Sequence, residues 1–139
     1  QRSDPRVEAH SAGTYPGDRV HPPAVAELVR RGIEPGSLKP KDISALGDRR
    51  WDIVITVCDS AKEACPTIPG RPAMVHWGMP DPAAVEGNPA AVENAFRITA
   101  NELSRRIDLM LALPLEKLEA LALEQRLSEI AQPEAEKIR

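Results

Sequence analysis

The sequence predicts an α/β fold: a small parallel sheet flanked by helices, with an extra helix at the C-terminus. The main observation is a near-continuous run of apolar residues at Trp51–Val57, which suits a strand buried on both faces of a parallel sheet. A second, shorter apolar run follows at Pro72–Trp77. Segments with helical apolar periodicity lie before and after these runs, and such an alternation is typical of α/β proteins with right-handed crossovers.

Residues that start or stop helices and strands bound the other elements. Arg6–Gly13 alternates polar and apolar residues and ends at a glycine, which predicts a strand followed by a turn. Pro22 begins the first helix and Gly32 ends it, while Asn88 is placed to cap a long helix that Pro114 ends. The predicted elements, in chain order, are strand Arg6–Gly13, helix Pro22–Gly32, strand Trp51–Val57, strand Pro72–Trp77, helix Asn88–Leu113 and helix Leu115–Ala131.

Each predicted helix has an apolar stripe at helical spacing. The stripes are Ala24, Val25, Leu28 and Val29 in the first helix, Val92, Phe96, Leu103, Ile107 and Leu111 in the second, and Leu118, Leu121, Leu127 and Ile130 in the third. The third stripe is expected to be a packed or dimerising face, so a homodimer is one option. We expect a main domain over residues 1–113 and a helical extension over 114–139. Three strands are few for a doubly wound sheet, and a central strand has no counterpart.

Composition argues against several classes of function. The 139 residues are 42% apolar, which suffices for one hydrophobic core. A formal net charge of −3, with both signs interspersed, argues against a general nucleic-acid or membrane-surface binder. No run of about 18 apolar residues occurs and the N-terminal residues are polar, so neither a membrane span nor a signal peptide is expected. Two cysteines without a secretion signal favour a cytoplasmic protein with redox-active or metal-binding thiols.

The two cysteines, Cys58 and Cys65, lie on one segment after the predicted strand Trp51–Val57. The residues between them favour a helix, in which seven positions span roughly 10 Å. The two Cα atoms of a disulfide lie only about 4.4–6.8 Å apart. If the segment is helical when reduced, it must change conformation to be oxidised, and the pair would then act as a switch. Two inert buried cysteines, or a zinc site with His76 as a further ligand, are the alternatives.

Asp81 is the candidate general acid or base. It lies between two prolines just after the predicted strand Pro72–Trp77, where a rigid backbone would fix its carboxylate. An ordinary turn aspartate is the alternative interpretation. Ligands of open α/β sheets bind beyond the carboxyl ends of the strands, so Cys58, Asp81 and the turn at Ser11 are expected to converge there. His10 and His21 are assigned no catalytic role.

Three segments together resemble the thioredoxin-coupled arsenate reductases of the low-molecular-weight tyrosine phosphatase fold. They are EAHSAG at residues 8–13, DIVITVCDSAKEACP at 52–66 and HWGMPDPA at 76–83. The resemblance covers roughly Val7–Leu113. A pair of cysteines seven residues apart, followed by a Trp-Gly-x-x-Asp-Pro loop, distinguishes these reductases from the plain phosphatases, which share only the aspartate-proline loop.

The resemblance implies that the complete protein reduces arsenate to arsenite through a relay of thiols and disulfides. Cys58 matches the family's second cysteine, Cys65 its third, and Asp81 the loop aspartate that serves proton transfer. A thioredoxin or a glutaredoxin-type thiol would reduce the final disulfide, and no cofactor would be tightly bound. Some family members bind potassium at positions that match Ser11 and Asp42.

The family's first cysteine lies in a Cys-x5-Arg loop that cradles the oxyanion on backbone N–H groups. That loop belongs upstream of EAHSAG, and no cysteine precedes Cys58. The 139 residues alone are therefore expected to be inactive, and an upstream segment outside this sequence is the favoured account. A truncated protein that fills the gap by swapping or dimerising, and a divergent non-catalytic protein, are the other accounts. The alternative functions are a low-molecular-weight tyrosine phosphatase and a dithiol redox module.

Overall fold

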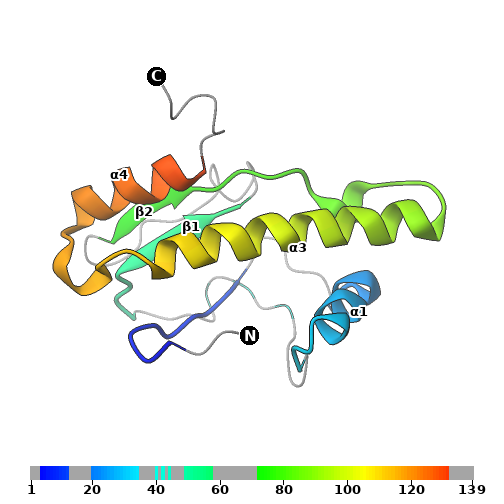
Figure 1. Cartoon of the computed structure of the whole chain (residues 1–139), viewed down its shortest axis with the longest axis horizontal. Coiled ribbons are helices and arrows are strands. Elements are labelled where there is room, and N and C mark those ends of the chain that lie inside the picture. Colours follow the sequence, from blue (N-terminus) through cyan, green and yellow to red (C-terminus); the bar gives the residue numbers. More distant parts are fainter. Residues whose placement is uncertain are drawn as a thin grey trace. The chain divides into compact units, whose positions relative to one another are not determined.

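The computed structural model describes residues 4–12, 20–34, 40, 42, 44, 49–57 and 72–131. In chain order its elements are α1 (Pro22–Arg30), β1 (Ile53–Thr56), β2 (Ala73–His76), the 3₁₀ turn η2 (Pro82–Ala84), α3 (Pro89–Leu111), the 3₁₀ turn η3 (Leu115–Lys117) and α4 (Ala120–Ile130) (Figure 1). The chain divides into two compact units. The first unit is Gln1–Gly47 with Pro80–Leu103, and the second is Asp48–Met79 with Ser104–Arg139. The helix α3 begins in the first unit and ends in the second.

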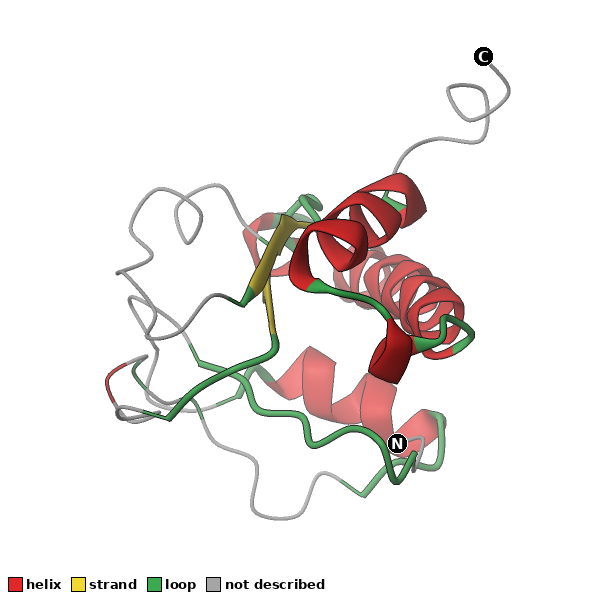
Figure 2. Cartoon of the chain, turned by 90° about the vertical axis from the view of Figure 1, so that its left-hand side faces the viewer, coloured by secondary structure: helices red, strands yellow, loops and turns green. Residues whose placement is uncertain are grey.

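The sheet lies in the second unit, where β1 and β2 pair in parallel (Figure 2). Their register aligns Ile53 with Ala73 at one end and Thr56 with His76 at the other. The hydrogen bonding continues past β1, because the Met79 N–H donates to the carbonyl of Val57 at 3.1 Å. The predicted small parallel sheet flanked by helices is confirmed, with both strands shorter than the apolar runs that predicted them.

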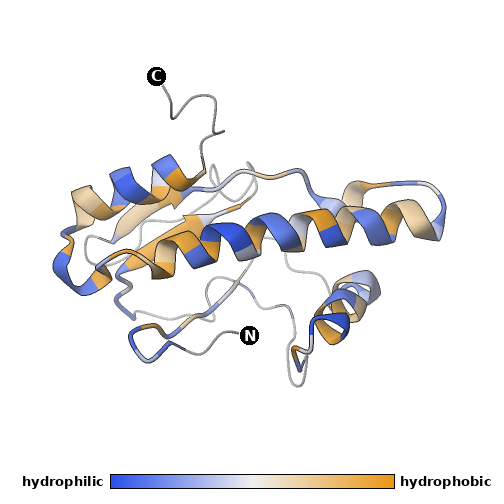
Figure 3. Cartoon of the chain, viewed as in Figure 1, coloured by the Kyte–Doolittle hydropathy of each residue, from blue (hydrophilic) through white to orange (hydrophobic). Residues whose placement is uncertain are grey.

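One face of β2 forms the core of the second unit with α4. Ala73, Val75 and Trp77 alternate along the strand and are buried, whereas Met74 between them is 41% exposed. From α4 the core receives Leu123, Leu127 and Ile130, and from β1 the partly buried Ile53 and Ile55. The apolar colouring of both strands beside α4 is visible in Figure 3. The indole N–H of Trp77 donates to the carbonyl of Leu127 at 2.8 Å, which adds a directional bond to this packing.

The third predicted stripe was wrong at one position. Leu121 is 81% exposed, and Leu123 is buried in its place. The reason is that the segment does not form one helix from Leu115: the turn η3 comes first, and α4 begins only at Ala120. Within α4 the buried residues follow a spacing of four and then three, which places them on a single face. That face packs on β2, so the homodimer through this helix stays a prediction, as does the domain boundary at residue 113.

Two predictions about strands were wrong. Residues 6–12 are exposed and form no strand, and a turn precedes them in which the Asp4 carboxylate accepts the backbone N–H of Arg6. An alternating segment becomes a strand only when another strand pairs with it, and none of the described residues pairs with this one. The strand β1 was expected to be buried on both faces. Its residues are only half-buried, since α4 covers one face of this two-stranded sheet.

The first unit is held by α1 and the start of α3, whose ends are formed by local signals. Gly32, with φ of +74°, ends α1 in a left-handed conformation, and the Ile33 N–H donates to the carbonyl of Leu28 at 2.9 Å. Asn88 caps α3 as predicted, since its side chain accepts the N–H of Ala91 at 2.8 Å. Both helix boundaries therefore follow from the residues at them.

Charge occupies the centre of the first unit. Glu27 is the buried residue of α1, whereas Val29 of the predicted stripe is 59% exposed. The Glu27 carboxylate accepts hydrogen bonds from the guanidinium groups of Arg30 and, at 2.7 Å, Arg31. Arg31 also donates to the side chain of Asn101 on α3. This arginine therefore links the two helices of the unit through polar contacts.

None of the helices among the described residues has the length and the apolar composition that a bilayer crossing requires.

Replacing Trp77 by Phe should destabilise the second unit. The substitution removes the indole donor and leaves the Leu127 carbonyl without that bond in a buried setting, at a cost of about 1–3 kcal/mol. Leu121→Ala is the matched control on α4, and it should change the free energy of unfolding by less than about 0.5 kcal/mol because the side chain is exposed. Urea unfolding of the two variants checks this. Equal midpoints for Trp77→Phe and the parent would contradict it.

The ion pairs of Glu27 should make stability depend on pH. Burial on its own raises the pKa of this carboxyl, but the hydrogen bonds and charges of Arg31 and Arg30 outweigh burial and hold the pKa below the ordinary value of 4.5. A lowered folded-state pKa gives stability that is fully present above 4.5 and is lost as pH falls through the lowered pKa. The stability difference between the parent and Glu27→Gln, measured by urea unfolding, should shrink below pH 4.5. A difference independent of pH would contradict the assignment.

Candidate active site

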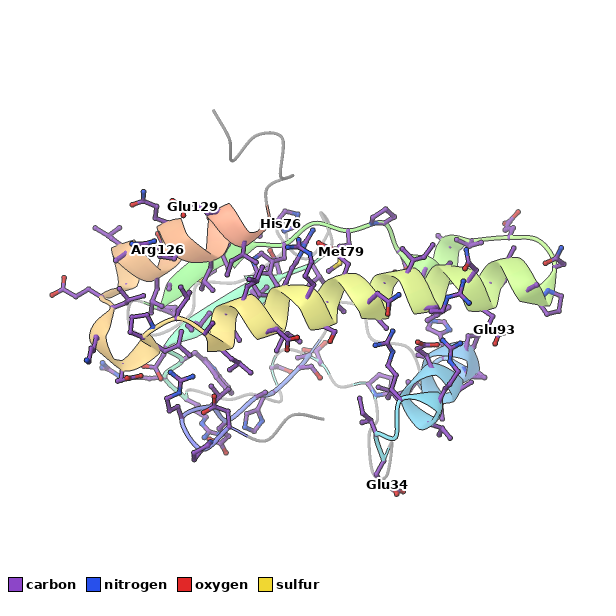
Figure 4. All side chains as sticks on the ribbon, viewed as in Figure 1. Glu34, His76, Met79, Glu93, Arg126 and Glu129 are labelled. Atoms are coloured by element: carbon purple, nitrogen blue, oxygen red, sulfur yellow. The ribbon has the colours of Figure 1, made fainter. Side chains whose placement is uncertain are left out.

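The carboxyl ends of β1 and β2 carry a paired threonine and histidine. Thr56 Oγ1 and His76 Nδ1 share a hydrogen bond of 2.7 Å across the two strands. The backbone supports the same position, because the Trp77 N–H donates to the carbonyl of Thr56 at 2.7 Å. Figure 4 labels His76 and Met79 at this end of β2. The sheet thus presents a fixed imidazole at the edge where α/β proteins place their ligands.

Gly78 leaves the space that this imidazole needs. A Cβ atom on residue 78 would lie 2.9 Å from Nε2 of His76, closer than such atoms approach one another. Among the described residues the glycines with positive φ are Gly32 and Gly87, so Gly78 is not required for a left-handed backbone. Its missing side chain serves the histidine ring instead.

The two candidate thiols, Cys58 and Cys65, lie outside the described residues. What the structure does fix is the residue before them: Val57 is held by the hydrogen bond from Met79 and directly precedes Cys58 in the sequence. The expected switch between two conformations of this segment stays a prediction. So does the zinc site, although His76, its proposed ligand, hydrogen bonds to Thr56 through Nδ1.

A Cys-x5-Arg spacing does occur once, from Cys65 to Arg71. It does not match the oxyanion loop of the resemblance in two respects. Pro66 and Pro69 lie within it and have no backbone N–H to offer an oxyanion. The strand β2 begins at Ala73, directly after it, so no helix N-terminus follows to add its dipole. This spacing is therefore a poor oxyanion cradle.

Asp81 lies in the first unit and caps the turn η2. Its Oδ1 accepts the N–H of Ala83 at 2.9 Å, and its carbonyl accepts the N–H of Ala84 at 3.1 Å. The side chain is exposed, and Pro82 directly follows it. One carboxylate oxygen is thus oriented by the backbone, an arrangement that suits a positioned acid or base. The convergence of Asp81 with Cys58 and Ser11 stays a prediction.

Ser11 and Asp42, the proposed potassium ligands, are both exposed in the first unit. The Asp42 carboxylate accepts the backbone N–H of Ser44 at 2.9 Å. Hydrogen bonding from the Ser44 backbone and then from its side chain lowers the pKa of Asp42, so this carboxyl is ionised at neutral pH. An ionised carboxylate and a serine oxygen are hard donors of the kind that alkali and alkaline-earth cations take. The donor chemistry fits potassium, and the site itself stays a prediction.

The parallel sheet, the aspartate-proline turn and the cysteine segment point to one family. A family model for low molecular weight phosphotyrosine protein phosphatases matches residues 3–119. The chain belongs to this family.

Characterised relatives within reach of this phosphatase family carry one activity name. The arsenate reductase of Halalkalibacterium halodurans is 32% identical over 101 residues, which are 73% of this chain and 67% of that protein. The arsenate reductase of Bacillus licheniformis is 30% identical with the same coverage. That of Shouchella clausii is 36% identical over 58% of this chain and 71% of its own length. The chain thus spans about two thirds of the length of the first two relatives.

The pair formed by Thr56 and His76 was missed as such from the sequence, where His76 was considered only as a zinc ligand. Its signal was present in the spacing. Once two parallel runs are aligned by their apolar residues, the last residue of each comes into register, and polar residues at that position face one another. In this member of the phosphatase family, the register alone brings the hydroxyl to the imidazole.

Substitution of Asp81 should separate its capping role from its charge. Asp81→Asn keeps a side-chain oxygen for the Ala83 N–H, so the unfolding midpoint should stay near that of the parent. Asp81→Ala removes the acceptor and should cost about 0.5–2 kcal/mol, the usual range for a lost cap. Urea unfolding compares the two variants. A loss of stability in the Asn variant equal to that of Ala would contradict the capping geometry.

Proposed function

We propose that this chain acts in the reduction of arsenate to arsenite through exchange between Cys58 and Cys65. The observation that carries the proposal is the union of two facts: the chain belongs to the low-molecular-weight phosphatase family, and relatives at about a third identity are named arsenate reductases. A cysteine pair on one segment supplies what a reductase needs and a phosphatase does not, since it accepts two electrons' worth of oxidation.

The overall reaction balances with two thiols. Arsenic passes from the pentavalent to the trivalent state and loses one oxygen as water, while two cysteine thiols lose two protons and two electrons and form one disulfide. In the proposed relay an upstream cysteine first holds arsenic, Cys58 displaces arsenite from it, and Cys65 then attacks Cys58 to take over the disulfide. Each attack requires a thiolate within reach of a sulfur and a leaving thiolate that can be protonated.

The remaining parts of the proposal concern Asp81, potassium and the reductant. Asp81 would donate the proton to the oxygen that leaves arsenic as water, because its carboxylate is oriented by η2 and exposed. Ser11 and Asp42 would hold potassium through oxygen atoms. A thioredoxin or a glutaredoxin-type thiol would reduce the Cys58–Cys65 disulfide in a reducing cytoplasm, where such disulfides are transient. No tightly bound cofactor is needed.

A dithiol redox module is the second candidate. It is favoured by one observation: no cysteine precedes Cys58, so residues 1–139 contain no counterpart of the family's first nucleophile. These residues by themselves are therefore expected to show no arsenate turnover. A phosphatase acting on phosphotyrosine is the third candidate, and the cysteine pair argues against it.

The test is arsenate-dependent oxidation of NADPH in the presence of thioredoxin and thioredoxin reductase, using the protein as its native cell makes it. Cys58→Ser and Cys65→Ser should each lower turnover by at least about 10³-fold, since each removes a nucleophile that the relay requires. Hydrolysis of p-nitrophenyl phosphate by the same Cys65→Ser variant is the control for folding and for phosphatase activity.

Turnover that survives Cys65→Ser would contradict the relay. Phosphate ester hydrolysis that exceeds arsenate reduction in the parent would favour the phosphatase instead. Disulfide mapping by mass spectrometry after one turnover adds an independent check, and the Cys58–Cys65 linkage is the expected product. Replacing thioredoxin by glutathione and glutaredoxin in the same assay identifies the reductant.

A further inference from the structure

Thr56 and His76 occupy the last position at which β1 and β2 are in register, on the face of the sheet away from α4. The residues of β2 that pack with α4 are Ala73, Val75 and Trp77, and side chains alternate between the two faces of a strand. His76 and its partner Thr56 therefore share the opposite face, where both are half-buried. The core does not explain this hydrogen bond, because neither residue belongs to it.

The imidazole is constrained on both of its nitrogens. Nδ1 is 2.7 Å from the Thr56 hydroxyl, and Nε2 occupies the space that a side chain at Gly78 would fill. Each constraint comes from a different part of the chain, one from β1 and one from the segment after β2. A ring fixed from two sides holds a single orientation, which a half-buried histidine with one contact would not.

The strand end that this ring holds is the one that leads to Cys58. The Thr56 carbonyl accepts the Trp77 N–H, and the Val57 carbonyl accepts the Met79 N–H. Thr56 is thus fixed through both its backbone and its side chain, and the next residue through its backbone. Cys58 follows Val57 directly in the sequence.

We propose that Thr56 and His76 are positioning residues for the thiol relay: they fix the end of β1, and through it the thiol of Cys58, for exchange with Cys65. This inference rests on the exchange proposed above. The attacking sulfur must approach along the axis of the disulfide that it breaks, and a misplacement of about 1 Å can slow a reaction by about 10²-fold. The pair acts through Cys58 and takes no part in bond making itself.

Ring closure with glutathione disulfide isolates this step without arsenate. The Cys58 thiolate attacks one sulfur of glutathione disulfide, forms a mixed disulfide and releases one glutathione thiolate. The Cys65 thiolate then attacks the Cys58 sulfur, and the second glutathione thiolate leaves. Two cysteine thiols lose two electrons, glutathione disulfide gains them, and the protons pass to solvent and the released thiolates. Acid quenching and mass spectrometry of the 139-residue chain follow both steps.

Four variants should separate positioning from a general loss of structure. His76→Phe and Thr56→Val each remove one partner and should slow closure by about tenfold or more. The double variant should be no slower than either single one, because both remove the same bond. Gly78→Ala keeps both partners but displaces the ring, so it should slow closure as well. His76→Asn places an amide about where Nδ1 lies and should restore most of the rate.

Met74→Leu is the control, on the same face one pair earlier, and should leave the closure rate unchanged. Thermal midpoints are recorded for every variant, and if His76→Phe fails to fold, Gly78→Ala carries the test. Normal closure in His76→Phe or in Gly78→Ala would overturn the inference, as would an Asn variant as slow as Phe. Normal closure in the parent with no arsenate turnover in the native protein would contradict the proposed function alone.

Discussion

The packing of Trp77 against α4 is the interaction on which the second unit depends. The indole is buried, and its N–H is bonded to the carbonyl of Leu127 inside the helix, so one side chain contributes both apolar area and a directional bond. Because Trp77 follows β2 directly, this contact fixes the strand face that meets α4. The opposite face, with Thr56 and His76, is then left for other tasks.

This division of the two faces explains how so small a sheet can prepare a reactive site. A two-stranded sheet has little stability by itself, and here α4 supplies the burial that a third strand would otherwise give. With the core placed on one side, the polar pair on the other side can be half-buried without disturbing it. The constraint on the His76 ring comes from backbone register and from a missing Cβ at Gly78, two features that cost little stability.

The first unit uses a different principle. Its helices are linked by Arg31, which bonds Glu27 on its own helix and Asn101 on α3, and by a tilted contact of the His21 and Phe96 rings with centroids 6.5 Å apart. Buried charge is weak evidence for stability, because desolvation opposes the attraction, but it specifies geometry well. Such a unit holds its helices in one arrangement by matching donors to acceptors rather than by apolar area.

The sequence by itself determined what depends on a few neighbouring residues. Pro22, Gly32 and Asn88 mark helix ends because caps and φ angles are local, and the apolar runs identify β1 and β2 with their parallel pairing. Only the tertiary structure decided which residues of a stripe are buried, as the exchange of Leu121 for Leu123 shows. It also decided that residues 6–12 form no strand and that Thr56 meets His76. Burial and strand pairing depend on partners far along the chain, and no local pattern contains them.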